Sequence, residues 1–121
     1  MAIRLTNPDS ENQMIIPEPF DPKVHVQPMI APINLTSETR LDFRRDALDA
    51  LEQAERLELS AVELDLAATT EMDASGLGVL ILLQKRAREK GMAVRLHRVP
   101  SAVDQLLDAT RLGSLFEIVR A

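Results

Sequence analysis

The residues of this sequence that could do chemistry are gathered between Asp65 and Gly78. Ser75 brings a hydroxyl, and Glu71 and Asp73 place two carboxylates shortly before it in the chain. A serine can attack as a nucleophile when a base activates it, accept a phosphoryl group, or cap the start of a helix. The rest of the sequence has to decide between these three roles for Ser75.

Nucleophilic catalysis by Ser75 requires a general base, and histidine is the usual one. The sequence has two histidines, His25 and His97. His97 falls in an alternating segment, in the phase opposite to Val94 and Leu96, so we expect a solvated strand residue. Metal-ligand spacing such as His-x-x-x-His does not occur, and cysteine is absent. We therefore predict no enzymatic activity, no metal and no cofactor.

Ser75 also has a purely structural interpretation. Its hydroxyl could accept hydrogen bonds from the amides of Leu77 or Gly78 and so cap a helix that starts there. Gly76 and Gly78 would then serve only close packing of the helix on a strand, and Asp73 would be a turn residue. The spacing of these residues leaves the structural and the functional interpretation open.

The elements that must position this segment alternate between strand and helix. Apolar residues recur every second position in strands and every third or fourth in helices. The order predicts an α/β fold with parallel strand pairing. Ser101 and Asp104 resemble a capping box at the start of the last helix. The expected elements are a strand at Val24–Ile30, a helix capped by Thr36 or Ser37 that runs to Arg56, a strand at Ala61–Leu66, a loop at Ala67–Ala74, a helix from Ser75 that Gly91 ends, a strand at Ala93–His97, a helix at Ser101–Thr110 and a strand at Leu115–Val119.

The composition is that of one globular domain. The chain has 121 residues, of which 45% are hydrophobic and 27% charged. A formal charge of −5 and the lack of Trp and Tyr disfavour nucleic acid as a partner. The longest apolar run, Val79–Leu83, is too short to span a membrane, so we expect no direct membrane insertion. A cytoplasmic location is the expectation that follows.

Proline separates the first part of the chain from the rest. Six of the seven prolines precede Ile33, and proline cannot sit inside a helix or a central strand. We predict that residues 1–23 form a Pro-rich arm, with a short edge strand at Ala2–Thr6 or Met14–Ile16. The folded domain would then comprise residues 24–121.

Two runs of residues, Asp65-Leu66 and Asp73-Ala74-Ser75-Gly76-Leu77-Gly78, carry a family resemblance. They resemble the hallmark of the STAS domain, found in bacterial anti-sigma factor antagonists and in the cytoplasmic tails of sulfate transporters. There, a strand ending in Asp-Leu is followed by a short loop and by Asp-Ser-Ser-Gly-Leu-Gly at a helix start. The similarity continues through Arg86–Gly91, Val94–Leu96, Ala102–Leu107 and Arg111–Phe116, and loosely over Val24–Leu57.

The resemblance implies an α/β fold, a single STAS-like domain with a mixed central β-sheet flanked by helices. Ser75 stands where the antagonists are phosphorylated, and Ala74 replaces the first serine of the family's pair. Asn34 replaces an aspartate that members often carry after the second strand, which puts its recognition role in question. The partner-binding residues implied are Asn34, Glu71, Asp73, Ala74, Gly76 and Leu77.

In the antagonists, the unmodified protein binds an anti-sigma factor that is also its serine kinase, and phosphorylation releases it. By resemblance, this chain would bind such a kinase until Ser75 is phosphorylated, and a phosphatase would restore binding. The positive end of a helix dipole tolerates a phosphate. Glu71 and Asp73 already make the surface acidic, so the added charge would repel the partner.

Two other functions are compatible with parts of the sequence. A small STAS subunit that regulates a membrane transporter, as in lipid-trafficking ABC systems, has a similar size and often carries threonine at the Ser75 position. A receiver domain also has an aspartate at a strand end, as Asp65 is here. However, no acidic pair follows Val24–Pro32, and the last lysine, Lys90, precedes the fourth expected strand. We therefore set the receiver domain aside and keep the transporter subunit as the alternative.

Overall fold

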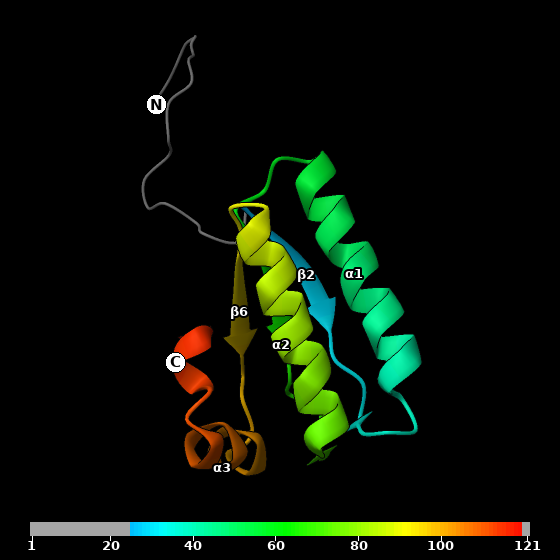
Figure 1. The fold of residues 1–121 in the computed structure, drawn as a ribbon, viewed down its shortest axis with the longest axis vertical. Coiled ribbons are helices and arrows are strands. Elements are labelled where there is room, and N and C mark those ends of the chain that lie inside the picture. The colour runs from blue at the N-terminus through cyan, green and yellow to red at the C-terminus, as the bar shows by residue number, and fades with distance from the viewer. Residues whose placement is uncertain (1–24, 120–121) are drawn as a thin grey trace, which may run out of the picture.

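A four-stranded sheet in the order β2-β4-β6-β7 forms the centre of the domain (Figure 1). The computed structural model describes residues 25–119. The elements are β2 Val26–Ile30, β3 Asn34–Leu35, α1 Arg40–Arg56, β4 Ala61–Asp65, β5 Glu71–Met72, α2 Ala74–Glu89, β6 Ala93–His97, α3 Ser101–Thr110, a 3-10 turn at Gly113–Leu115, and β7 Glu117–Val119.

Two helices, α1 and α2, pack side by side on one face of this sheet (Figure 1). Successive side chains of a strand point to opposite faces of the sheet, so every second one faces the two helices. The register places Leu64 of β4 beside Leu96 of β6. Each fully buried leucine stabilises the fold by about 1.5–3 kcal/mol relative to an exposed one. The core shared by the sheet and the two helices includes Phe43, Ala47, Leu51, Val62, Leu64, Leu80, Leu83, Val94 and Leu96.

Every strand pairing within residues 25–119 is parallel. The strands of the sheet therefore end at the same edge, and the loops that follow them meet there. The edge strands predicted at Ala2–Thr6 or Met14–Ile16 lie outside the described residues. That the sheet combines parallel and antiparallel pairings therefore remains a prediction. The division of the chain into an arm and a domain at residue 23 also remains a prediction.

A second, very small sheet lies beyond this edge and was not predicted. Strand β3 follows β2, strand β5 precedes α2, and the two pair in parallel with Asn34 opposite Glu71 and Leu35 opposite Met72. The expected loop at Ala67–Ala74 therefore contains a strand. Two-residue strands carry no visible alternation, so the sequence pattern could not reveal them.

The starts predicted for α1 and β7 are wrong, whereas α3 has its predicted bounds, Ser101–Thr110, and lacks only the predicted cap. Helix α1 begins at Arg40, because the Thr39 hydroxyl donates to the Asn34 carbonyl (2.7 Å) and accepts from the Thr36 amide (3.1 Å), which holds a turn before the helix. Ser101 is the first residue of α3 after Pro100 and makes no side-chain cap, so no capping box forms. Strand β7 starts only at Glu117, because the 3-10 turn occupies the preceding residues.

The predicted end of α2 is confirmed. Gly91 follows the cap residue Lys90 with a φ of +74°, the left-handed conformation that glycine adopts without strain. Within residues 25–119, no helix has the length and apolar character needed to cross a membrane. The same described residues contain no group of three or more histidine, aspartate or glutamate side chains placed to hold a metal ion.

Candidate functional site

Ser75 lies in the first turn of α2, at the edge where the parallel strands end. Helix α2 begins at Ala74, so Ser75 is its second residue and is partly exposed. No hydrogen bond from the Ser75 hydroxyl is found among the residues that the structure describes. The hydroxyl is therefore available to an incoming reagent.

Asp73, and not Ser75, caps this helix. Its backbone is extended (φ −120°, ψ −174°), and its Oδ1 accepts from the amides of Ser75 (2.9 Å) and Gly76 (3.1 Å). The expectation that the Ser75 hydroxyl caps the helix toward Leu77 or Gly78 is wrong. An extended residue just before the first helical turn aims its side chain at these amides, whereas Ser75 already has helical geometry.

The Asp73 carboxylate also ties two loops together. Its Oδ2 accepts from the amide of Ser37, in the loop before α1 (3.1 Å). Hydrogen bonds from the amides of Gly76, Ser37 and Ser75, that of Gly76 contributing most, lower the pKa of Asp73 below its ordinary value of 3.8. Asp73 is therefore fully ionised at neutral pH, close to Ser75.

Gly76 and Leu77 are buried, so they belong to the scaffold that holds Ser75. A β-carbon at position 76 would lie 2.0 Å from the carbonyl oxygen of Leu35, which shows how closely α2 approaches β3. Leu77 is only 6% exposed. These two predicted partner-binding residues present little surface, and any effect on a partner would be indirect. Asn34, Glu71, Asp73 and Ala74 are at least partly exposed, and their role toward a partner remains a prediction.

Hydrogen bonds hold the loop before α2 against the loop before α1. The buried Thr69 hydroxyl donates to the Pro32 carbonyl (2.8 Å), and the Thr70 amide donates to the Ile33 carbonyl (2.8 Å). The Asp73 amide donates to Leu35 (3.1 Å). Both loops thus form one layer under the start of α2. The partner residues predicted from distant parts of the sequence, Asn34 and Glu71, come together in this layer.

A groove of about 280 Å³ runs beside Ser75, between the first turns of α1 and α2. Sequence reasoning did not identify the α1 side of this groove. The spacing within α1 shows which residues share a face, but nothing in it reveals that this face meets Ser75. The lining residues are Arg40, Leu41 and Arg44 of α1, and Ala74, Ser75, Gly78, Val79 and Leu82 of α2.

Neither histidine is placed to act as a base for Ser75. His97 is aligned with Asp65 and points, in the strand alternation, to the sheet face opposite to the helices. There it lines a separate pocket of about 410 Å³ with Ile30 and Arg98. His25 lies just before β2, and its carbonyl accepts from the Ser60 hydroxyl, at the opposite edge of the sheet. Within residues 25–119, neither histidine therefore lies where it could take a proton from the Ser75 hydroxyl.

Asp65, the other aspartate of the hallmark, also lies outside the groove. It pairs with Arg98, in the segment after β6, and its side chain accepts from the Ala67 amide (2.9 Å). The hydrogen bond from Arg98 is the main reason that the pKa of Asp65 is lowered. Asp65 thus has a structural role at the end of β4.

Comparison with family models gives a match to the model described as Mlab, STAS domain, over residues 33–119. A search of curated proteins gives no match. Among solved structures, TM1081 from Thermotoga maritima, assigned as an anti-sigma factor antagonist, is similar with a TM-score of 0.65 and 21% identity, over 78% of this chain and 80% of that one.

Two further structures share the fold. A sulfate transporter family protein from Wolinella succinogenes has a TM-score of 0.61 and 17% identity, over 93% of this chain and 86% of that one. The Bacillus anti-sigma factor antagonist SpoIIAA, in its unphosphorylated form, has a TM-score of 0.59 and 12% identity, over 80% of this chain and 81% of that one. At these identities, the likeness concerns the arrangement of strands and helices.

Proposed function

Because the chain belongs to the STAS domain family, we propose that it is a phosphorylation-regulated protein-binding module, an anti-sigma factor antagonist. In this proposal it binds a serine-kinase anti-sigma factor when Ser75 is unmodified and is released when Ser75 is phosphorylated. A phosphatase returns it to the binding state. Solved antagonists with the same fold, one of them known in unphosphorylated and phosphorylated forms, support this assignment.

The observation that carries the proposal is the placement of Ser75. Its hydroxyl is partly exposed beside a groove, while Asp73 caps the helix in its place. The Ser75 side chain is therefore not needed for the fold and can be modified without removing a cap. In the reaction, a bond forms between Ser75 Oγ and the γ-phosphorus of ATP, the bond from that phosphorus to ADP breaks, and the hydroxyl proton passes to the kinase or to solvent.

The test is capture of tagged protein from the source organism, washed with or without Mg-ATP. We expect the wild type to release its partner with ATP, Ser75→Ala to retain it, and Ser75→Asp to bind weakly. Ser101→Asp is the matched control, since Ser101 is an exposed serine in the first turn of another helix. Mass spectrometry would identify the partner and the modified Ser75 peptide. Tight, ATP-insensitive binding by Ser75→Asp would contradict the switch.

The alternative is a STAS regulatory subunit of a membrane transporter of the lipid-trafficking ABC type. It is favoured by the family model, which is that of Mlab, and by the fold shared with a sulfate transporter family protein. The same capture experiment separates the two functions. A permease and an ATPase as partners, together with a Ser75 peptide that is never modified, would support the transporter subunit.

A further inference from the structure

We infer that Arg40 and Arg44 bind the phosphate of phosphorylated Ser75, and that this contact closes the groove between α1 and α2 to a partner. The inference rests on the proposed function for the modification of Ser75. It adds the residues that receive the phosphate and a physical reason for release.

The three side chains share one space. Arg40 and Arg44 are one helical turn apart in α1, and both line the groove of about 280 Å³ that Ser75 lines from α2. The two helices are packed against each other, so the groove has fixed walls. A phosphate on Ser75 would therefore be formed beside a groove that two arginines already line.

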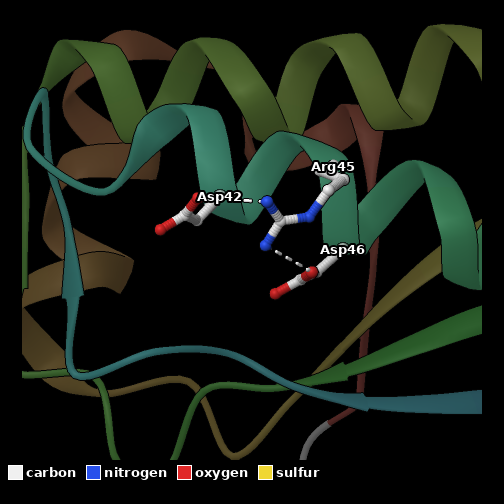
Figure 2. A network of polar contacts seen from close by, with 3 residues as sticks. All are labelled: Asp42, Arg45 and Asp46. Atoms are coloured by element: carbon white, nitrogen blue, oxygen red, sulfur yellow. Dashed lines mark hydrogen bonds and ion pairs between the residues drawn. The ribbon is translucent and has the colours of Figure 1, made fainter.

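Neither arginine is engaged elsewhere in the described part of the chain. Arg40 and Arg44 are exposed and form no ion pair among residues 25–119. Arg45, their neighbour, has its guanidinium 3.3 Å from Asp42 and 3.4 Å from Asp46. Figure 2 shows this network on the flank of α1 away from α2. The acidic residues of the first turns of α1 thus neutralise Arg45 and leave the groove arginines for another anion.

The position of Arg40 is also unfavourable for the helix itself. The N-terminal turn of a helix carries a partial positive charge, and cations there are destabilising by a few tenths of a kcal/mol each in exposed settings. Arg40 is the first residue of α1, where this cost applies, whereas Arg44 lies beyond the first turn. Residues that break a local rule without compensation inside the fold often serve a function.

The backbone of α2 has few donors to offer the phosphate, because three of the first four amides of the helix are engaged and only that of Ala74 has no hydrogen bond within residues 25–119. The amides of Ser75 and Gly76 already donate to Asp73, and the amide of Leu77 donates to the Asp73 carbonyl (3.0 Å). The expectation that the helix start tolerates a phosphate remains a prediction, and further donors would have to come from outside the backbone of α2. Two arginines balance the roughly −1.5 to −2 charges of a phosphoserine, and the guanidinium fork suits phosphate oxygens.

The floor of the groove leaves room for the phosphate and for the arginines that close over it. A β-carbon at Gly78 would meet no atom within 4 Å, so this part of the groove is open. Leu41, on the opposite wall, is 66% exposed. When Arg40 and Arg44 bind the phosphate, they cross the opening and cover this apolar floor. A partner is then released because the two arginines cover the groove surface that it would contact. Any electrostatic repulsion by Glu71 and Asp73 would add to this effect.

The test uses the full chain with phosphoserine incorporated genetically at position 75. The phosphate is titrated by ³¹P NMR in three backgrounds: wild type, Arg40→Gln/Arg44→Gln, and the control Arg45→Gln. We expect the second pKa of the phosphate, ordinarily about 6, to lie roughly one pH unit higher in the double variant than in the wild type. Arg45→Gln should titrate like the wild type, because its guanidinium faces Asp42 and Asp46.

A second readout needs no substitution. Phosphorylation should shift and sharpen the Nε–H signals of two arginines in the wild-type protein, and these signals should be missing in the double variant. Equal phosphate pKa values in all backgrounds, or arginine signals that do not respond, would overturn the inference. Neither NMR result depends on a kinase or a partner. These measurements therefore test only the phosphate contact, and the capture experiment tests the proposed function separately.

Discussion

At the scale of single residues, Asp73 has the largest share in holding Ser75 in place. Its carboxylate accepts from three amides, on α2 and on the loop before α1. Because its pKa is lowered in the folded protein, its ionised form stabilises the fold. This stability is present above the ordinary value of 3.8 and is lost as the pH falls through the lower folded value.

We expect Asp73→Asn to unfold at a lower temperature than the wild type at pH 7, because the amide keeps one acceptor oxygen but loses the charge. The difference should shrink steadily below pH 4 as the wild-type carboxylate takes up its proton. Thermal unfolding followed by circular dichroism from pH 7 to pH 2.5 would measure it. Asp49→Asn, at an exposed position within α1, is the control. A difference that stays constant with pH would argue against a charged cap.

Two neighbouring glycines should respond in opposite ways to the same substitution. Gly76→Ala places its β-carbon 2.0 Å from the Leu35 carbonyl oxygen and forces α2 and β3 apart. We expect a loss of about 1–3 kcal/mol in the free energy of unfolding. Gly78→Ala meets open space and should gain up to about 1 kcal/mol from helix propensity. Urea unfolding measures both, and equal effects would contradict the close approach at Gly76.

At the scale of elements, the layer formed by the two loops determines where α2 begins. Thr69 is the buried polar residue at its centre, with a 3% exposed side chain that donates to Pro32. Thr69→Val would leave the Pro32 carbonyl without this donor, at a cost of about 1–3 kcal/mol. Amide exchange at Thr70 and Asp73 should accelerate, because both amides donate across the two loops.

Thr69→Ser keeps the hydroxyl and is the control for this prediction. Its exchange rates at the two amides should remain close to those of the wild type. Acceleration limited to the termini of α2, with Thr70 and Asp73 unchanged, would show that Thr69 does not couple the loops.

The sequence revealed long elements and missed short or distant contacts. Strands β4 and β6 were predicted because their alternation is clear, and the start of α2 was placed within one residue by its hallmark. The cap was assigned to Ser75, since both serine and aspartate suit that role and only the backbone conformation at Asp73 decides between them. The meeting of Arg40 with Ser75 depends on how α1 packs against α2, and neither helix pattern encodes that packing direction.

At the scale of the whole molecule, the core beneath α1 and α2 supplies the stability that the site uses. We expect Leu80→Ala, at a fully buried position of α2, to cost about 2–5 kcal/mol. Leu41→Ala, at an exposed position in the groove, should change stability by less than about 0.5 kcal/mol. Chemical unfolding with circular dichroism compares them. A large loss for Leu41→Ala would mean that the groove belongs to the core.

Because the strands are parallel, the site lies at one end of the molecule and a reporter group can be attached at the other. The site lies where the strands end, whereas the last turn of α2 lies at the opposite end of that helix, about 20 Å from Ser75 at 1.5 Å per residue. The sequence has no cysteine and no tryptophan, so a single cysteine at the exposed Arg88 would carry the sole thiol-linked dye. Such a probe would report binding and release of the proposed partner by fluorescence anisotropy, because it lies far from the surface proposed for that partner.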